Sequence, residues 1–351
     1  MPMHLAPPPP GEAKFAIIIP VFNTARYVGE CLESVLSQTH KNFRAFLVDD
    51  GSTDSSGAIL DTYASQDTRL TVVHKENGGV SSARNRALDL VEADGSFDYV
   101  LCLDSDDVLT PECLSTVSQY ASCDRLLLFG VQTFDKHGPF RQESKIPHEP
   151  KYFSKEESFG FSLDGTCKAY SSSPAFSLSL GNVVLPTERI RGLRFDENLV
   201  QAEDQDFKMK VLDRCNGLLA ISDLLLHYRL RKGSLSHNKT FRTDDLHVFL
   251  RKALEKGTSE TIQKVIESKA AGYWWSTLKR SVYLGRLKEY WPESRATLQT
   301  MVENFRTGVL KSPRYRKRIR IFMLGQIAVW LYFSFQLATR PNSSANIDYF
   351  E

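Results

Sequence analysis

The sequence contains few cysteines and none of the cysteine patterns that bind zinc. Six cysteines are scattered over its 351 residues. They form no C-x-x-C pair, and no histidine cluster accompanies them. This pattern disfavours a zinc site and a secreted disulfide framework, and it favours reduced, cytosolic thiols.

Two phosphate-binding patterns and a signal peptide are also missing. No Gly-Lys-Ser/Thr follows the glycine pair at 78–79, and no G-x-G-x-x-G follows a strand-like segment. A Walker loop is therefore absent, and a dinucleotide-binding Rossmann domain is disfavoured. The first residues contain Pro7–Pro10 but no apolar core, which predicts a flexible leader over 1–12 in place of a signal peptide.

The composition is that of an ordinary globular protein, with 42% hydrophobic and 25% charged residues, but its charge is unevenly distributed. Residues 1–235 hold 24 Lys+Arg and 32 Asp+Glu, a balance of −8. Residues 236–351 hold 20 and 10, a balance of +10. We expect two regions with different partners, and composition alone leaves nucleic acid and an anionic membrane surface open for the basic region.

Strand-like and helix-like segments alternate over the first 110 residues. The apolar, β-rich run 15–22 predicts a buried parallel strand, and the spacing of apolar residues over 27–38 predicts a helix after it. Further strands are predicted at 43–48, 70–73 and 99–103, and further helices at 55–64 and 81–91. Such alternation is typical of βαβ units, so we expect an α/β fold with a ligand site beyond the carboxyl ends of its parallel strands.

Acidic residues gather where two of these strands end. Asp49 and Asp50 follow the second strand, and Asp104, Asp106 and Asp107 follow the fourth. Carboxylates two residues apart can converge on one Mg²⁺ or Mn²⁺, which completes its shell with substrate phosphates. Aspartates at strand ends also form tight turns and helix caps, and that alternative stays open for both clusters.

A glycine pair precedes the helix predicted at 81–91. Gly78 and Gly79 permit a close approach of the backbone, and the N-terminus of the helix that follows attracts anions. Arg84 lies one turn into this helix, where a phosphate contact and an ordinary surface position are both open interpretations.

Together these segments resemble a known family. FAIIIPVFN (15–23), VDDGSTD (48–54), NGGVSSARN (77–85) and LDSDD (103–107), in this order and spacing, resemble family-2 glycosyltransferases with the GT-A nucleotide-sugar fold. The resemblance implies an α/β, Rossmann-like and mostly parallel sheet sandwiched by helices, followed by a C-terminal helical extension. We expect the catalytic domain to span 13–235.

The resemblance also implies roles for individual residues. Those expected to bind the nucleotide-sugar are Pro20, Phe22, Asn23, Asp50, Asn77, Gly79, Arg84, Asp104, Ser105, Glu203 and Arg229. Phe22 would stack near the base, which Asp50 would bind. Asp104 would bind the ribose or the metal, and Asp106 would be the main ligand of Mn²⁺ or Mg²⁺.

Further along the chain, the resemblance implies a catalytic acidic pair. Glu203-Asp204 matches this pair, with Asp204 as the general base, and a helix-capping cluster is the alternative. Arg229 would contact the diphosphate, and His227 would complete the metal shell unless it is structural, as lone histidines more often are. Many relatives have an Asn-Lys pair or a tryptophan ahead of the acidic pair, but here Asn182 is followed by valine, which leaves the acceptor open.

The C-terminal third predicts a helical region over 236–310 and a tail over 311–351. Residues 311–320 include six basic residues, and residues 321–338 carry no charge. This combination favours a helix lying on, or marginally inserted in, an anionic membrane surface. A buried helix packed on the catalytic domain is the alternative. We expect a cytoplasmic protein, peripheral on the inner face of the cell membrane.

The function implied is that of a metal-dependent inverting glycosyltransferase. It would move a sugar from a nucleotide diphosphate-sugar, expected to be a UDP-sugar, to a hydroxyl of a glycan or lipid-linked acceptor in surface polysaccharide synthesis. A retaining or hydrolytic enzyme on the same fold is one alternative, and a catalytically silent nucleotide-sugar-binding or scaffold protein is another. A nucleic-acid partner is disfavoured, because the basic stretch is separate from the acidic pocket and no nucleic-acid motif occurs.

Overall fold

The computed structural model describes residues 8–9, 11–135, 138–139, 149–155, 157–158, 180–199 and 203–230. The strands are β1 (Phe15–Val21), β2 (Phe43–Asp49), β3 (Leu70–His74), β4 (Tyr99–Cys102), β5 (Val108–Leu109), β6 (Leu126–Asp135), β7 (Gly138–Pro139), β8 (Lys151–Ser154), β9 (Val183–Pro186) and β10 (Gly217–Arg229). The helices are α1 (Val28–Leu36), α2 (Ser56–Gln66), α3 (Val80–Asp94), α4 (Cys113–Tyr120), α6 (Thr187–Ile190) and α7 (Glu203–Arg214), with the 3₁₀ turn η2 (Leu180–Asn182).

All the described strands belong to one sheet with the order β3-β2-β1-β4-β9-β6-β10-β5, to which β7 and β8 add beside β6 and β10. The four strands predicted from the first 110 residues pair in parallel, as expected. The other half of the sheet is mixed: β6 and β10 are parallel, whereas β9 runs antiparallel to both β4 and β6. The expectation of a mostly parallel sheet therefore holds only for the half that contains the βαβ units.

Strand β1 lies in the middle of the parallel half because its sequence is apolar on both faces. Six of its seven residues are buried. Phe15, Ile17 and Ile19 belong to one buried cluster with Val28 and Leu32 of α1. Each large apolar side chain buried in this way stabilises the fold by roughly 1.5–3 kcal/mol.

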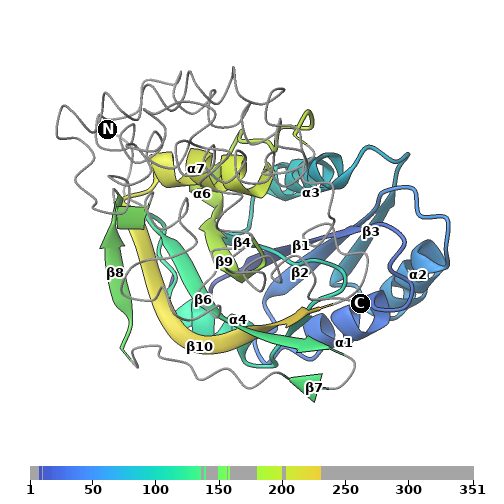
Figure 1. Ribbon diagram of the computed structural model, residues 1–351, viewed down its shortest axis with the longest axis horizontal. Coiled ribbons are helices and arrows are strands. Elements are labelled where there is room, and N and C mark those ends of the chain that lie inside the picture. Colours follow the sequence, from blue (N-terminus) through green and yellow to red (C-terminus); the bar gives the residue numbers. More distant parts are fainter. Residues whose placement is uncertain are drawn as a thin grey trace, which may run out of the picture. The chain divides into compact units, whose positions relative to one another are not determined.

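Helices cover both faces of the sheet. Figure 1 shows α3, α6 and α7 on one side of the central strands and α1 and α2 on the other. The buried residues of α3 recur at helical spacing, with Ala83, Ala87, Leu88 and Val91 in contact with the core. The sandwich of a sheet between helices, implied by the resemblance to GT-A proteins, is confirmed for the described residues.

Several expectations concern residues outside this description. The leader, the helical region at 236–310 and the tail at 311–351 all lie largely or wholly outside it. Within the part of the chain that the structure does describe, no helix has the length and apolar character needed to cross a membrane. Of the six cysteines, the five in the described residues are free thiols.

Candidate active site

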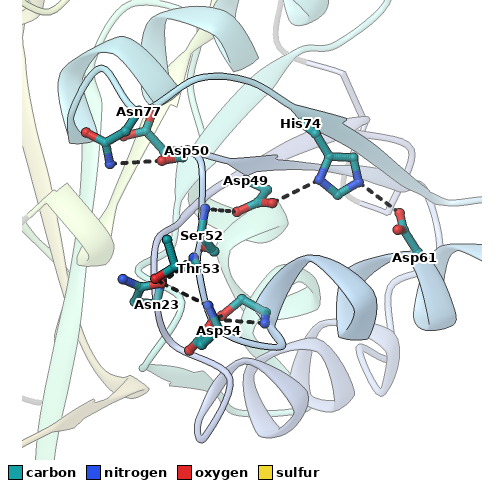
Figure 2. A network of polar contacts seen from close by, with 10 residues as sticks. Asn23, Asp49, Asp50, Ser52, Thr53, Asp54, Asp61, His74 and Asn77 are labelled. Atoms are coloured by element: carbon teal, nitrogen blue, oxygen red, sulfur yellow. Dashed lines mark hydrogen bonds and ion pairs between the residues drawn. The ribbon is translucent and has the colours of Figure 1, made fainter.

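The end of β1 presents an exposed aromatic ring beside a tightly held turn. Phe22, directly after β1, is 48% exposed, which is unusual for a large apolar side chain in this fold. Asn23 adopts a positive φ of 52°. Its side-chain oxygen accepts hydrogen bonds from the backbone N–H groups of Thr53 (2.8 Å) and Asp54 (3.3 Å), as Figure 2 shows. Asn23 thus joins the ends of β1 and β2, while Phe22 remains available for stacking.

Pro20 lies on β1 beyond Ile18, where the pairing with β4 ends.

Asp50 is almost completely buried and is held by the glycine loop. Its carboxylate accepts hydrogen bonds from the N–H groups of Gly78 (3.0 Å) and Gly79 (2.8 Å) and from Lys75 Nζ (2.6 Å). Asn77 Nδ2 donates to the Asp50 carbonyl at 2.9 Å (Figure 2). Gly79 needs its freedom from a side chain here, because its φ is +87°. In this arrangement Asp50 fixes the loop that precedes α3.

The neighbouring Asp49 belongs to a separate network on the edge of the sheet. His74 Nδ1 lies 2.9 Å from Asp49 Oδ2, and His74 Nε2 lies 3.0 Å from Asp61 Oδ1 (Figure 2). The hydrogen bonds to Asp49 and Asp61 raise the pKa of His74. Asp49 also accepts the backbone N–H of Ser52, so the turn interpretation of this aspartate is confirmed.

This network predicts a small pH-dependent contribution to stability. Because the pKa of His74 is raised on folding, its contribution is complete below the unfolded value of about 6.5 and disappears as the pH rises through the folded value. We expect His74→Gln to lower the free energy of unfolding by less than about 1 kcal/mol at pH 5, since the ring is half exposed. Urea unfolding from pH 5 to 9 tests this, and a difference that does not shrink at high pH would contradict it.

The acidic loop after β4 combines exposed and buried carboxylates. The Asp104 side chain is 45% exposed, Asp106 is half-buried, and Asp107 is buried. Burial and the charges of Asp104 and Asp106 raise the pKa of Asp107 well above its usual value. Ser105 is buried and accepts a hydrogen bond from the Thr24 hydroxyl at 3.0 Å, which ties the loop to the end of β1.

Arg229, at the end of β10, holds this acidic loop in place. Its backbone N–H donates to Asp107 Oδ1 at 2.9 Å, and its Nε donates to the Asp106 carbonyl at 2.9 Å. The guanidinium pairs with Glu30 of α1 at 2.6 Å and lies 4.3 Å from the centre of the Phe134 ring. These contacts show that Arg229 supports the acidic loop. A diphosphate would have to compete with them for the guanidinium.

Arg84 links the acidic loop to the start of α7. Its side chain is 6% exposed, and it donates to Asp104 Oδ1 at 3.0 Å and to Glu203 Oε1 at 3.1 Å. Burial works against the charged form, but the charges of Asp104 and Glu203 outweigh it and raise the pKa of Arg84 further. The surface interpretation of this arginine is therefore wrong. Arg84 lies 119 positions before Glu203 in the sequence, so the contact depends on the tertiary fold.

The predicted catalytic pair opens helix α7. Glu203 and Asp204 lie in its first turn, where the helix dipole favours negative charge. Burial and the neighbouring Asp204 raise the pKa of Glu203. Burial also opposes ionisation of Asp204, but Lys208 and Arg84 more than compensate and hold the pKa of Asp204 below its usual value. Lys208 and Arg84 thus favour the ionised form of Asp204.

The donor set fits a hard divalent cation, although only as an incomplete site. Among the described residues, no group of three or more His, Cys, Asp or Glu side chains is arranged to hold a metal ion. Asp104 and Asp106 offer the carboxylate oxygens that Mg²⁺ and Mn²⁺ prefer, and such ions normally take their other ligands from phosphates and water.

His227 lies beside the same loop. In β10 it is in register with Val108, two residues after Asp106, and it packs edge-on against Phe134. Burial lowers the pKa of His227, which favours the neutral ring that binds metals.

Asn182 is fully buried and donates to the carbonyl of Phe129 at 2.8 Å.

Four residues that support the site were not predicted from the sequence: Thr24, Glu30, Lys75 and Lys208. Lys208 could have been found from its spacing, because it lies four positions after Asp204 and therefore on the same face of a helix. The other three meet their partners only through the tertiary fold.

The described residues combine a mixed α/β sheet with acidic residues after β4, a glycine loop before α3 and an acidic pair at the start of α7, and this arrangement matches the GT-A fold. Residues 16–174 match the family model described as Glycosyl transferase family 2. The chain is therefore similar to this family over somewhat less than half of its length.

Curated and solved proteins show the same similarity. The glycosyltransferase EpsJ of Bacillus subtilis is 34% identical over 230 residues, covering 63% of this chain and 62% of EpsJ. S. aureus TarS 1–349 in complex with UDP-GlcNAc superposes with a TM-score of 0.58 at 20% identity, covering 85% of this chain and 93% of that one. The mannosyltransferase PcManGT of Pyrobaculum calidifontis, with GDP-Man and Mn²⁺, has a TM-score of 0.53 at 14% identity, covering 94% and 88%. The chain spans between about a third and just under two thirds of the length of the first curated relatives it matches.

Proposed function

We propose that this chain is a metal-dependent inverting glycosyltransferase that uses a UDP-sugar. The observation that carries the proposal is the buried Arg84, which joins Asp104 of the acidic loop to Glu203 beside Asp204. One ion-pair network thus brings Asp104, expected to bind the ribose or the metal, next to the expected base. The binding of UDP-GlcNAc by TarS and of GDP-Man by PcManGT supports a nucleotide-sugar as donor.

The chemistry assigns a separate task to each part. Asp106 and Asp104 would hold a divalent cation, which supplies positive charge to the departing diphosphate. Asp204 accepts the proton of the acceptor hydroxyl while that oxygen forms a bond to the anomeric carbon. The bond from this carbon to the diphosphate oxygen breaks, and its electron pair leaves with the nucleoside diphosphate. A single displacement from the opposite face inverts the configuration, so an α-linked donor gives a β-linked product.

The acceptor and the location of the protein complete the proposal. We expect a hydroxyl of a glycan or lipid-linked acceptor in surface polysaccharide synthesis. The six basic residues at 311–320 and the uncharged stretch at 321–338 suit an anionic membrane surface on the cytoplasmic side. This placement would bring the site to an acceptor that is anchored in the same membrane.

Isothermal titration with UDP, GDP and dTDP, each in Mn²⁺ and in EDTA, tests the donor site. We expect metal-dependent binding of UDP that is lost in Asp106→Ala, because Asp106 is one of the two carboxylates of the loop, with Asp104, that are not buried. Glu188→Ala, which removes an exposed carboxylate on α6, serves as the matched control and should bind as the wild type does. If no nucleotide binds to the folded protein, the silent scaffold becomes the better interpretation.

A further inference from the structure

Helix α7 contains a lysine whose side chain is completely buried. Lys208 has 0% side-chain exposure and ranks among the largest fully buried side chains of the described residues. A buried ammonium group is costly unless a carboxylate faces it. Lys208 Nζ donates to Asp204 Oδ2 at 3.1 Å, one helical turn away. The carboxylate that this lysine faces is therefore the expected catalytic base.

The two partners differ in their access to solvent. The Asp204 side chain retains 29% exposure, whereas Lys208 has none. An acceptor hydroxyl can therefore approach the carboxylate while the ammonium stays behind it, within the protein. One oxygen of Asp204 is engaged by the lysine, which restricts rotation of the carboxylate about its own axis.

We propose that Lys208 is a positioning residue that orients Asp204 and keeps it ionised for proton abstraction. This inference rests on the proposed function, because it assigns a role within the same site. The motifs that carry the resemblance assign no role to Lys208, which lies four positions after Asp204. The same helix contains a second pair at the same spacing, Asp206 with Lys210, but Lys210 is 21% exposed and this pair lies outside the ion-pair network of Arg84.

Among the described residues, charged groups of two helices act on the ionisation of Asp204. Glu203 and Lys208 act from α7, and Arg84 acts from α3. Burial raises the pKa of Asp204, and Lys208 is the strongest of the influences that lower it. Without the lysine the effect of burial is opposed mainly by Arg84, so the pKa of Asp204 rises. As the pH is lowered, the rate of transfer should then begin to fall at a higher pH than in the wild type.

The test is the pH dependence of kcat/KM for sugar transfer by the wild type, Lys208→Met and Lys208→Arg. In Lys208→Met we expect the acidic limb of the profile of kcat/KM against pH to move upward by at least about one pH unit, which is a tenfold change in ionisation. Nucleotide affinity should be unchanged. Lys208→Arg retains the charge and should move the limb back toward the wild-type position. Lys210→Met, the matched control on the same helix, should leave the limb in place.

The outcomes separate this inference from the proposed function. A folded Lys208→Met variant with the wild-type acidic limb and kcat overturns the role of Lys208 and leaves the glycosyltransferase intact. A wild type that binds nucleotide but transfers no sugar overturns both. If Lys208→Met does not fold, Lys208→Gln, which retains a donor at the same place, provides the same readout.

Discussion

Asp204→Asn is expected to lower kcat/KM for sugar transfer by about 10²–10⁴-fold, the usual cost of removing a positioned base. Asparagine keeps the shape of the side chain but cannot take up the proton of the acceptor hydroxyl. Nucleotide affinity should change little, because the ion pair of Asp204 is with Lys208 of the same helix and not with the acidic loop. Rate measurements at saturating donor, together with titration of UDP, distinguish these two effects.

This variant also has a predictable cost in stability. It leaves the ammonium group of Lys208 buried without its carboxylate, and breaking a buried ion pair in this way typically costs about 3–5 kcal/mol. The decrease in the free energy of unfolding should lie at the lower end of this range, because Asp204 is partly exposed. The double variant Asp204→Asn/Lys208→Met should recover stability in urea unfolding but should not recover activity. Recovery of both would show that Asp204 is structural.

Asp206→Asn is the matched control for the same helix. Asp206 also faces a lysine four residues later, so its loss disturbs an ion pair of the same spacing. Since Asp206 is not joined to Arg84, we expect this variant to retain most of its transfer activity. An equal loss of rate in Asp206→Asn and Asp204→Asn would argue that any disturbance of α7 abolishes transfer.

The parallel half of the fold was predictable because its signals are local. β1 and β2 are short runs of apolar, β-rich residues, and the polar residues that follow each run mark its end. The prediction of a site at the carboxyl ends of these strands follows from the topology of βαβ units alone. The contacts between the end of β1 and the loop after β2 confirm that these ends meet.

The other half of the sheet has no such local signal. β10 is 13 residues long and contains Asp223 in its middle, and its pairing with β6 is interrupted by two register shifts. These irregularities remove the alternation by which a strand is identified in a sequence. β9 has only four residues, and its place between β4 and β6 depends on partners more than 50 positions away.

In the candidate site, too, some features have a local sequence signal and others do not. The sequence identifies the carboxylates, because they occur in short motifs, but it does not identify their partners. Asp50 was expected to bind a base, whereas its carboxylate is occupied by Lys75 and by the N–H groups of Gly78 and Gly79. Arg84 was expected to meet a phosphate or solvent, whereas it meets two carboxylates from distant segments. Hydrogen bonds of this kind depend on the tertiary fold and leave no periodic pattern.

Arg84→Met is expected to reduce stability and nucleotide binding together. The variant leaves Glu203 and Asp104 without the cation between them, and Glu203 is 15% exposed. Loss of a buried partner supports an expected decrease of about 3 kcal/mol in the free energy of unfolding. Metal-dependent binding of UDP should weaken at the same time, because Asp104 loses the group that orients its carboxylate.

Two further variants determine whether the effect depends on the geometry of the guanidinium. Arg84→Lys keeps the charge, but a single ammonium cannot reproduce the planar fork that reaches both carboxylates, so it should recover only part of the stability. Arg194→Met is the matched control: Arg194 also binds two carboxylates, Asp89 and Glu92, but it is 33% exposed. We expect this surface network to contribute at most about 1 kcal/mol and to leave UDP binding unchanged. If urea unfolding and titration show equal losses in Arg84→Met and Arg194→Met, the link between the acidic loop and α7 has no special role, and the two halves of the site are positioned independently.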